Sequence, residues 1–156
     1  MNHPAFFFPP DSIGPVSHES RTLWLSYRIS VTTHDRIHIL FEHYTKSPKQ
    51  CITLSLAKRN HRVAINGTDA GRFVLWTHTA PRHVEIDITK AGRGSELCIF
   101  NGWEDLKQGT LLYGLRYAAI DVQAQVDGSV ILNCSDGWGE ADFTDLQVRV
   151  IRERAA

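Results

Sequence analysis

Residues 117–134 read YAAIDVQAQVDGSVILNC, and this stretch gives the clearest indication of the fold class. In its first half, apolar residues such as Ile120 and Val122 alternate with polar ones, and its second half is a short apolar run. Alternation with a period of two is typical of a half-buried antiparallel strand. Asp127-Gly128 between the halves is a favoured hairpin turn, because glycine adopts positive φ angles without steric cost. The stretch therefore predicts a β-hairpin.

The same pattern recurs in other segments. In HVEIDIT, for example, Val84 and Ile86 alternate with Glu85 and Asp87. Strands are predicted, from alternation or from short apolar runs bounded by turn residues, at 22–31, 51–57, 62–65, 73–76, 83–89, 96–101, 117–126, 129–134 and 145–152. In the first of these the alternation predicts a single apolar face made of Leu23, Leu25, Tyr27, Ile29 and Val31.

Residues 33–44, THDRIHILFEHY, fit two interpretations. His34, His38 and Glu42 recur with the four-residue spacing of one helix face. The apolar residues among them alternate instead as in a strand, and we predict a strand here.

Nine to ten short strands have edges that must be hidden by closing one sheet or by pairing two. No internal repeat is visible, which argues against a propeller. We therefore predict an all-β fold, an antiparallel β-sandwich of jelly-roll type. The chain of 156 residues is long enough for one domain, which we place at 21–156. Residues 1–20 are predicted to form an extended arm rich in proline and phenylalanine.

The arm carries Phe6, Phe7 and Phe8 in a row. Three adjacent exposed phenylalanines are unfavourable in water, so we expect them to be buried in the assembled protein. Burial across a homodimer interface is the preferred interpretation, and burial within one chain is the alternative.

Charge and composition argue against several classes of partner. Lys plus Arg and Asp plus Glu number 17 each, so neither nucleic acid nor a membrane surface is expected as a partner. The opening lacks the basic and apolar regions of a signal peptide, and three cysteines without CxxC spacing do not indicate a disulfide framework or a zinc site. We predict a soluble cytoplasmic protein with reduced thiols and no cofactor.

Two glycine-flanked tryptophans are the candidate ligand-binding residues. Trp103 in NGWED and Trp138 in DGWGE each stand beside carboxylates. A flat apolar ring beside acidic acceptors is what a sugar site requires. The predicted site has one side made of Asp136, Trp138 and Glu140 and the other made of Trp103, Glu104 and Asp105. In the alternative interpretation both rings cap the core and the acids belong to solvated turns.

The loop that contains Trp138 is unusually acidic and raises the question of a cation. Calcium prefers six to eight oxygen ligands, and Asp142 or Asp145 could contribute to such a site. The spacing does not match a helix–loop–helix calcium site, and calcium is the minority interpretation. A histidine site is less favoured, because His34 and His38 in one strand lie roughly 13 Å apart, too far to share an ion.

Catalytic motifs are sparse. No G-x-S-x-G nucleophile elbow, phosphate-binding loop or dinucleotide fingerprint occurs in the sequence. A glycoside hydrolase would need Glu104 or Asp105 to meet Asp136 or Glu140 as a carboxylate pair, and this stays open.

Three segments together are similar to the jelly-roll modules of the galactose-binding, carbohydrate-binding type. These are IFNGW at 99–103, the acidic CSDGWGEADF loop at 134–143 and a closing strand DLQVRVI at 145–151, within a resemblance that spans residues 21–152. It implies aromatic sugar contacts on one face or rim and a structural calcium near the chain ends. The expected function is a non-catalytic carbohydrate-binding module. The alternatives are an assembly subunit that dimerises through the arm and a small glycoside hydrolase.

Overall fold

The structure is a computed structural model that describes residues 5–58 and 60–155, which form fourteen strands and no helix. The strands are β1 Val16–His18, β2 Arg21–Trp24, β3 Tyr27–Ser30, β4 Arg36–Tyr44, β5 Gln50–Leu56, β6 Arg62–Ile65, β7 Thr68–Ala70, β8 Arg72–Trp76, β9 His83–Lys90, β10 Glu96–Glu104, β11 Leu111–Leu112, β12 Ala119–Ala124, β13 Val130–Ser135 and β14 Leu146–Glu153. The all-β prediction is confirmed. The count exceeds nine to ten because the short strands β1, β7 and β11 were not predicted and because 22–31 forms two strands. In this part of the chain, no helix is long and apolar enough to cross a membrane.

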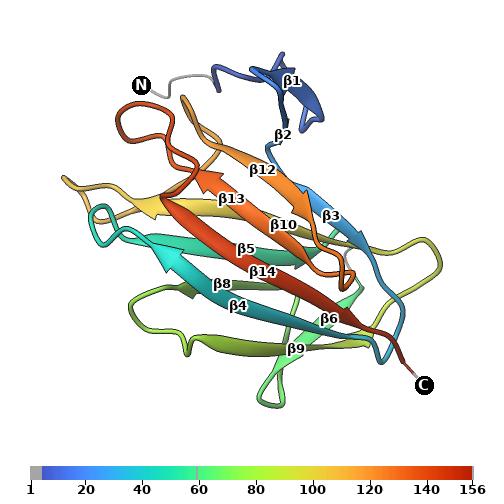
Figure 1. Ribbon diagram of the computed structural model, residues 1–156. Helices are drawn as coiled ribbons and strands as arrows, with labels where there is room; N and C mark the ends of the chain where they lie inside the picture. The colour runs from blue at the N-terminus through green and yellow to red at the C-terminus, as the bar shows by residue number, and fades with distance from the viewer. Residues whose placement is uncertain (1–4, 59, 156) are drawn as a thin grey trace.

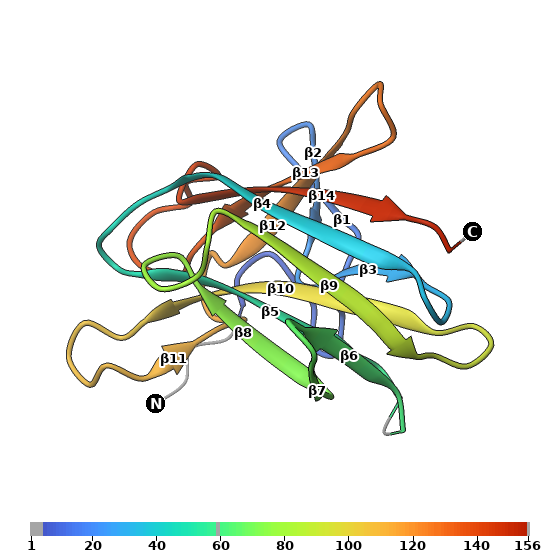
Figure 2. The same ribbon diagram turned by 90° about the horizontal axis from the view of Figure 1, so that it is seen from below.

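The strands form two antiparallel sheets that pack face to face (Figures 1 and 2). One sheet has nine strands in the order β1-β2-β12-β13-β14-β4-β9-β6-β7. The other has the order β11-β10-β5-β8, and β3 also pairs with β10. Most connections from β2 to β12 cross from one sheet to the other, as in a jelly roll. The predicted sandwich is therefore confirmed.

The main core lies between the two sheets. Ile37, Ile39 and Phe41 of β4 point into it and are almost fully buried, which confirms a strand in the ambiguous segment 33–44. Strand β9 contributes Val84 and Ile86 in the same alternating way. Burying each such side chain contributes roughly 1.5–3 kcal/mol to the free energy of unfolding. In both strands, the period-two alternation of the sequence marks the buried face.

The segment 22–31 is not one strand, and its predicted single apolar face is wrong. After Trp24 the chain leaves the nine-stranded sheet, where β2 pairs with β12, and enters the other sheet, where β3 pairs with β10. Leu23 consequently lies in a small separate cluster with Phe8, whereas Ile29 packs on the main core. Alternation continues through the crossing because both strands are half buried, and the sequence pattern does not mark the crossing point.

The N-terminal arm packs against its own domain. The amide of Phe6 donates a hydrogen bond to the carbonyl of Arg116 at 2.7 Å. Phe8 is 8% exposed, Phe7 is partly buried, and Phe6 remains 52% exposed. The later part of the predicted arm contains β1, which pairs with β2 and is therefore part of the nine-stranded sheet. Residues 1–4 lie outside the described residues, and a homodimer through the arm stays a prediction.

The cysteine side chains are all free and buried. Burial raises the pKa of the Cys51 thiol to about 12, and it also raises the pKa values of Cys98 and Cys134. A raised pKa leaves little thiolate, which is the reactive form. The thiols therefore behave as small core side chains.

Candidate functional site

The two predicted tryptophan loops lie at the same end of the sandwich, opposite the end where β14 runs to the C-terminus (Figures 1 and 2). The first is the loop 105–110 from β10 to β11, and Trp103 lies near the end of β10, just before it. Asp105 organises it, since its amide donates to Thr110 at 2.8 Å and its carboxylate accepts the amide of Lys107 at 2.9 Å. The turn brings β11 back beside Trp103 and Glu104, so both side chains are held by a strand ladder.

The second loop joins β13 to β14 and is organised by Asp136. Its carboxylate accepts one hydrogen bond from the Gln50 side chain at 2.8 Å and one from the amide of Trp138 at 2.9 Å. The carboxylate of Asp145 in turn accepts the amide of Asp136 at 3.0 Å. These bonds fix the backbone on both sides of Gly137, and they set the position from which Trp138 projects.

Phe143 and Leu146 anchor the far end of this loop. Leu146 is fully buried in the main core, and Phe143 packs on the small cluster that contains Phe8. The guanidinium of Arg21 lies over the Phe143 ring, 4.4 Å from its centre, which is a favourable cation–π distance. The acidic loop is therefore attached to the sandwich at both of its ends.

The two loops touch through Trp103 and Gly137. A Cβ atom added at Gly137 would lie 2.5 Å from the Trp103 ring and 2.7 Å from the carbonyl oxygen of Leu115. Only glycine leaves room for so close an approach of ring and backbone. Trp103 is consequently 3% exposed and forms the contact between the loops, whereas Trp138 is 54% exposed.

A pocket of about 630 Å³ lies between the loops. Its volume falls within the usual range of small-molecule sites, roughly 300–1,000 Å³. The pocket is lined by Trp103, Glu104, Asp105, Leu106, Lys107, Gln108, Thr110, Leu112, Leu115, Arg116, Gly137 and Trp138. Both tryptophans therefore border one pocket, with very different exposure to solvent.

The predicted ligand-binding residues divide into two groups. Trp103, Glu104, Asp105 and Trp138 line the pocket. Asp136 is 1% exposed and lies behind it, and Glu140 is exposed but is not part of the lining. A carboxylate pair that joins either lining acid to Asp136 or Glu140, as a glycoside hydrolase would need, is thus not present in the lining.

Charges of both signs surround the pocket. Glu104 and Asp105 supply carboxylates, and Lys107 and Arg116 supply cations. The Glu104 carboxylate also lies 3.8 Å from the ammonium of Lys49. A lining with both donors and acceptors suits a neutral ligand that is rich in hydroxyl groups better than a ligand of one charge.

Asp136 and Asp145 form a close acidic pair. Burial raises the pKa of both carboxyl groups. For Asp145 the pKa rises to about 7, because burial and the negative charges of Asp136 and Asp142 outweigh the hydrogen bond from the Asp136 amide. Near neutral pH the pair therefore tends to retain a proton, which relieves the repulsion between the two acids.

The residues predicted for calcium are occupied by hydrogen bonds within the loop. Asp142 accepts the hydroxyl of Thr144 at 2.7 Å and its amide at 2.9 Å, and these bonds lower the pKa of Asp142. Asp145 accepts the Asp136 amide and tends to be protonated, and a proton competes with a cation. The arrangement thus meets only part of the demand of calcium for six to eight oxygens, and a calcium ion at these residues stays a prediction.

Several lining residues were not predicted from the sequence. Lys107, Gln108 and Thr110 follow the NGWED motif directly, and the turn at Gly109 (φ 69°) could have indicated that they fold back beside it. Arg116 belongs to a segment with no motif, and the parallel bridge to Ala5 of the arm holds it in place. No local signal in the sequence identifies Arg116.

The chain was also compared with protein-family models, with curated proteins and with solved structures, and none of the three comparisons finds a match.

Proposed function

We propose that the chain is a non-catalytic binding module whose pocket at Trp103 and Trp138 holds a carbohydrate or a similar small polar ligand. One observation carries the proposal: the half-exposed Trp138 indole lines the same pocket as the Glu104 and Asp105 carboxylates. An exposed indole offers an apolar plate for the C–H face of a sugar ring, and carboxylates accept hydrogen bonds from its hydroxyls.

The rigidity of the two walls supports the same proposal. Trp138 is held by the hydrogen bond from its amide to Asp136, and Glu104 by the strand ladder between β10 and β11. A ligand that meets preorganised groups loses less free energy to ordering them. The reduced, buried thiols agree with the cytoplasmic location that we infer from the sequence.

The test is binding to a glycan array followed by calorimetry with the best sugar. Trp138→Ala removes the plate and should weaken binding by about 2 kcal/mol or more, roughly 30-fold. Tyr113→Ala is the matched control, because Tyr113 is a comparably exposed aromatic residue, 49% exposed, outside the pocket lining. Equal affinities for the two variants, or no sugar binding at all, would contradict the proposal.

A homodimer formed through the arm is the second proposal, and one observation favours it. Phe6 stays 52% exposed although its ring packs edge-on against Tyr117, with ring centres 4.8 Å apart. Light scattering over a range of protein concentrations should then show a dimer that Phe6→Ala weakens. A monomer at every concentration would rule the dimer out.

A further inference from the structure

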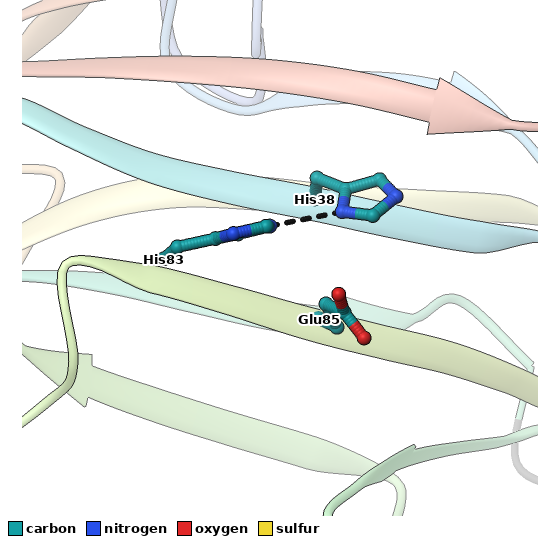
Figure 3. Close-up of side chains that lie close together, drawn as sticks. All are labelled: His38, His83 and Glu85. Carbon is teal, nitrogen blue, oxygen red and sulfur yellow. Dashed lines mark hydrogen bonds between the residues drawn. The ribbon is translucent and has the colours of Figure 1, made fainter.

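A cluster of histidine and carboxylate side chains lies on the outer face of the nine-stranded sheet, on strands β4 and β9. His38 of β4 stands directly opposite Glu85 of β9, and His83 precedes Glu85 by two residues on the same face. Figure 3 shows the three side chains lying close together over the two strands. One ligand atom from each lies within 4.8 Å of the other two.

The two imidazoles have almost the spacing that a shared metal ion needs. His38 Nδ1 and His83 Nε2 are 2.9 Å apart and form a hydrogen bond (Figure 3). Two nitrogens bound to one tetrahedral zinc ion at about 2.0–2.1 Å lie roughly 3.3 Å apart, so the rings need to separate by about 0.4 Å. His83 and Glu85 are exposed and have room to turn.

Glu153 of β14 orients His38 for this role. Its carboxylate lies 2.9 Å from His38 Nε2 and, because an ionised carboxylate only accepts hydrogen bonds, Nε2 carries the proton. The lone pair of neutral His38 is then on Nδ1, the atom that faces His83. A carboxylate on the far nitrogen of a ligating histidine is the usual supporting contact in protein zinc sites.

Arg36 is the neighbouring cation that must be considered. Its guanidinium lies 3.5 Å from the Glu85 carboxylate, and its shorter bond, 2.8 Å, is to Asp87. Glu85 can therefore turn toward the histidines while Arg36 keeps its partner on Asp87. With Glu85 and Glu153 on either side of His38, the charge around the two imidazoles favours a cation.

We propose that His38, His83 and Glu85 bind one divalent transition-metal ion of the zinc class. Imidazole nitrogens select such ions over magnesium and calcium, which prefer oxygen ligands. Three protein ligands leave the fourth position of a tetrahedral ion open to water or to another ligand. The bound ion would link β4 to β9 on the outer face of the sheet.

The test is a calorimetric titration of Zn²⁺ into the full chain, from which any affinity tag has been removed. A second titration uses Mg²⁺ instead. The chain should bind one Zn²⁺ ion, and bound zinc should raise the melting temperature of the protein. Magnesium should neither bind nor change the melting temperature. His83→Ala should weaken zinc binding at least tenfold, with His83→Gln as a second variant and circular dichroism to confirm folding. His78→Ala, at an exposed histidine elsewhere, should leave zinc affinity unchanged.

Glu153 separates a built site from chance proximity. Glu153→Ala should lower zinc affinity by about tenfold, and Glu153→Gln should restore part of it, since the amide oxygen still accepts the proton of His38 Nε2. Zinc binding that is unchanged in His83→Ala, or that falls equally in His78→Ala, would overturn the proposal.

Discussion

The pocket at Trp138 and the histidine cluster at His38 are built in opposite ways. The pocket lies between two loops, and hydrogen bonds, a strand ladder and the N-terminal arm support its walls. The histidine cluster lies on an open sheet face, and its side chains are held mainly by one another and by Glu153. The pocket therefore depends on the packing behind it, whereas the cluster depends on the register of strands β4, β9 and β14.

The largest expected effect tests this dependence on packing. Phe8 is the buried phenylalanine of the arm, so Phe8→Ala should lower the free energy of unfolding by about 3 kcal/mol. Two other variants should each lower the free energy of unfolding by less than about 1 kcal/mol. These are Phe6→Ala, at an exposed residue near Phe8, and His83→Ala, on the sheet face. Urea unfolding of the three variants measures the difference, and similar losses in all three would remove the contrast between the regions.

Gly137 tests the contact between the two loops. Gly137→Ala forces a Cβ atom against the Trp103 ring and the Leu115 carbonyl. Such overpacking should lower the free energy of unfolding by about 1–3 kcal/mol. Gly71→Ala is the matched control, because its Cβ would meet only the end of the Arg62 side chain at 3.5 Å. The free energy of unfolding of Gly71→Ala should stay within about 0.5 kcal/mol of that of the wild type. Equal melting temperatures for the two variants would show that Trp103 does not pack on Gly137.

A smaller, pH-dependent effect is expected from Asp145. Its pKa is about 7 in the folded protein and ordinarily 3.8, so between these values the folded state holds a proton that the unfolded chain has lost. The free energy of unfolding therefore falls as pH rises through this window. Asp145→Asn removes this contribution and keeps an acceptor for the Asp136 amide.

Melting curves at several pH values measure this effect. The melting temperature of the variant should rise relative to that of the wild type between pH 3.8 and about pH 7, by about 2–4 °C for each kcal/mol, and the difference should level off at higher pH. A constant difference across the range would contradict the raised pKa of Asp145. A calcium-dependent rise in the wild-type melting temperature, abolished by a chelator, would instead support the predicted cation at Asp142 or Asp145.

The two regions also differ in how far the sequence predicts them. NGWED and DGWGE mark Trp103 and Trp138 because each motif is local, and both tryptophans do line one pocket. The motifs also suggested Asp136, whose burial no local pattern reveals. In the structure Asp136 is buried and bonded to Gln50, a residue 86 positions away in the chain.

His38 and His83 are 45 positions apart in the chain, and only strand register brings them together. Spacing within one strand compares only residues of that strand, and it says nothing of a neighbouring strand. The crossing after Trp24 is hidden for a similar reason, because alternation within a strand carries no information about which sheet the strand joins.

NMR of the indole N–H groups tests whether the pocket at Trp138 is the ligand site. The chain has four tryptophans, so the spectrum contains its own controls. With the best sugar from the array, the Trp138 signal should shift the most, Trp103 slightly, and Trp24 and Trp76 not at all. If the sugar shifts the signal of Trp76, which lines a different pocket, and leaves that of Trp138 unchanged, the pocket at Trp138 is not the ligand site.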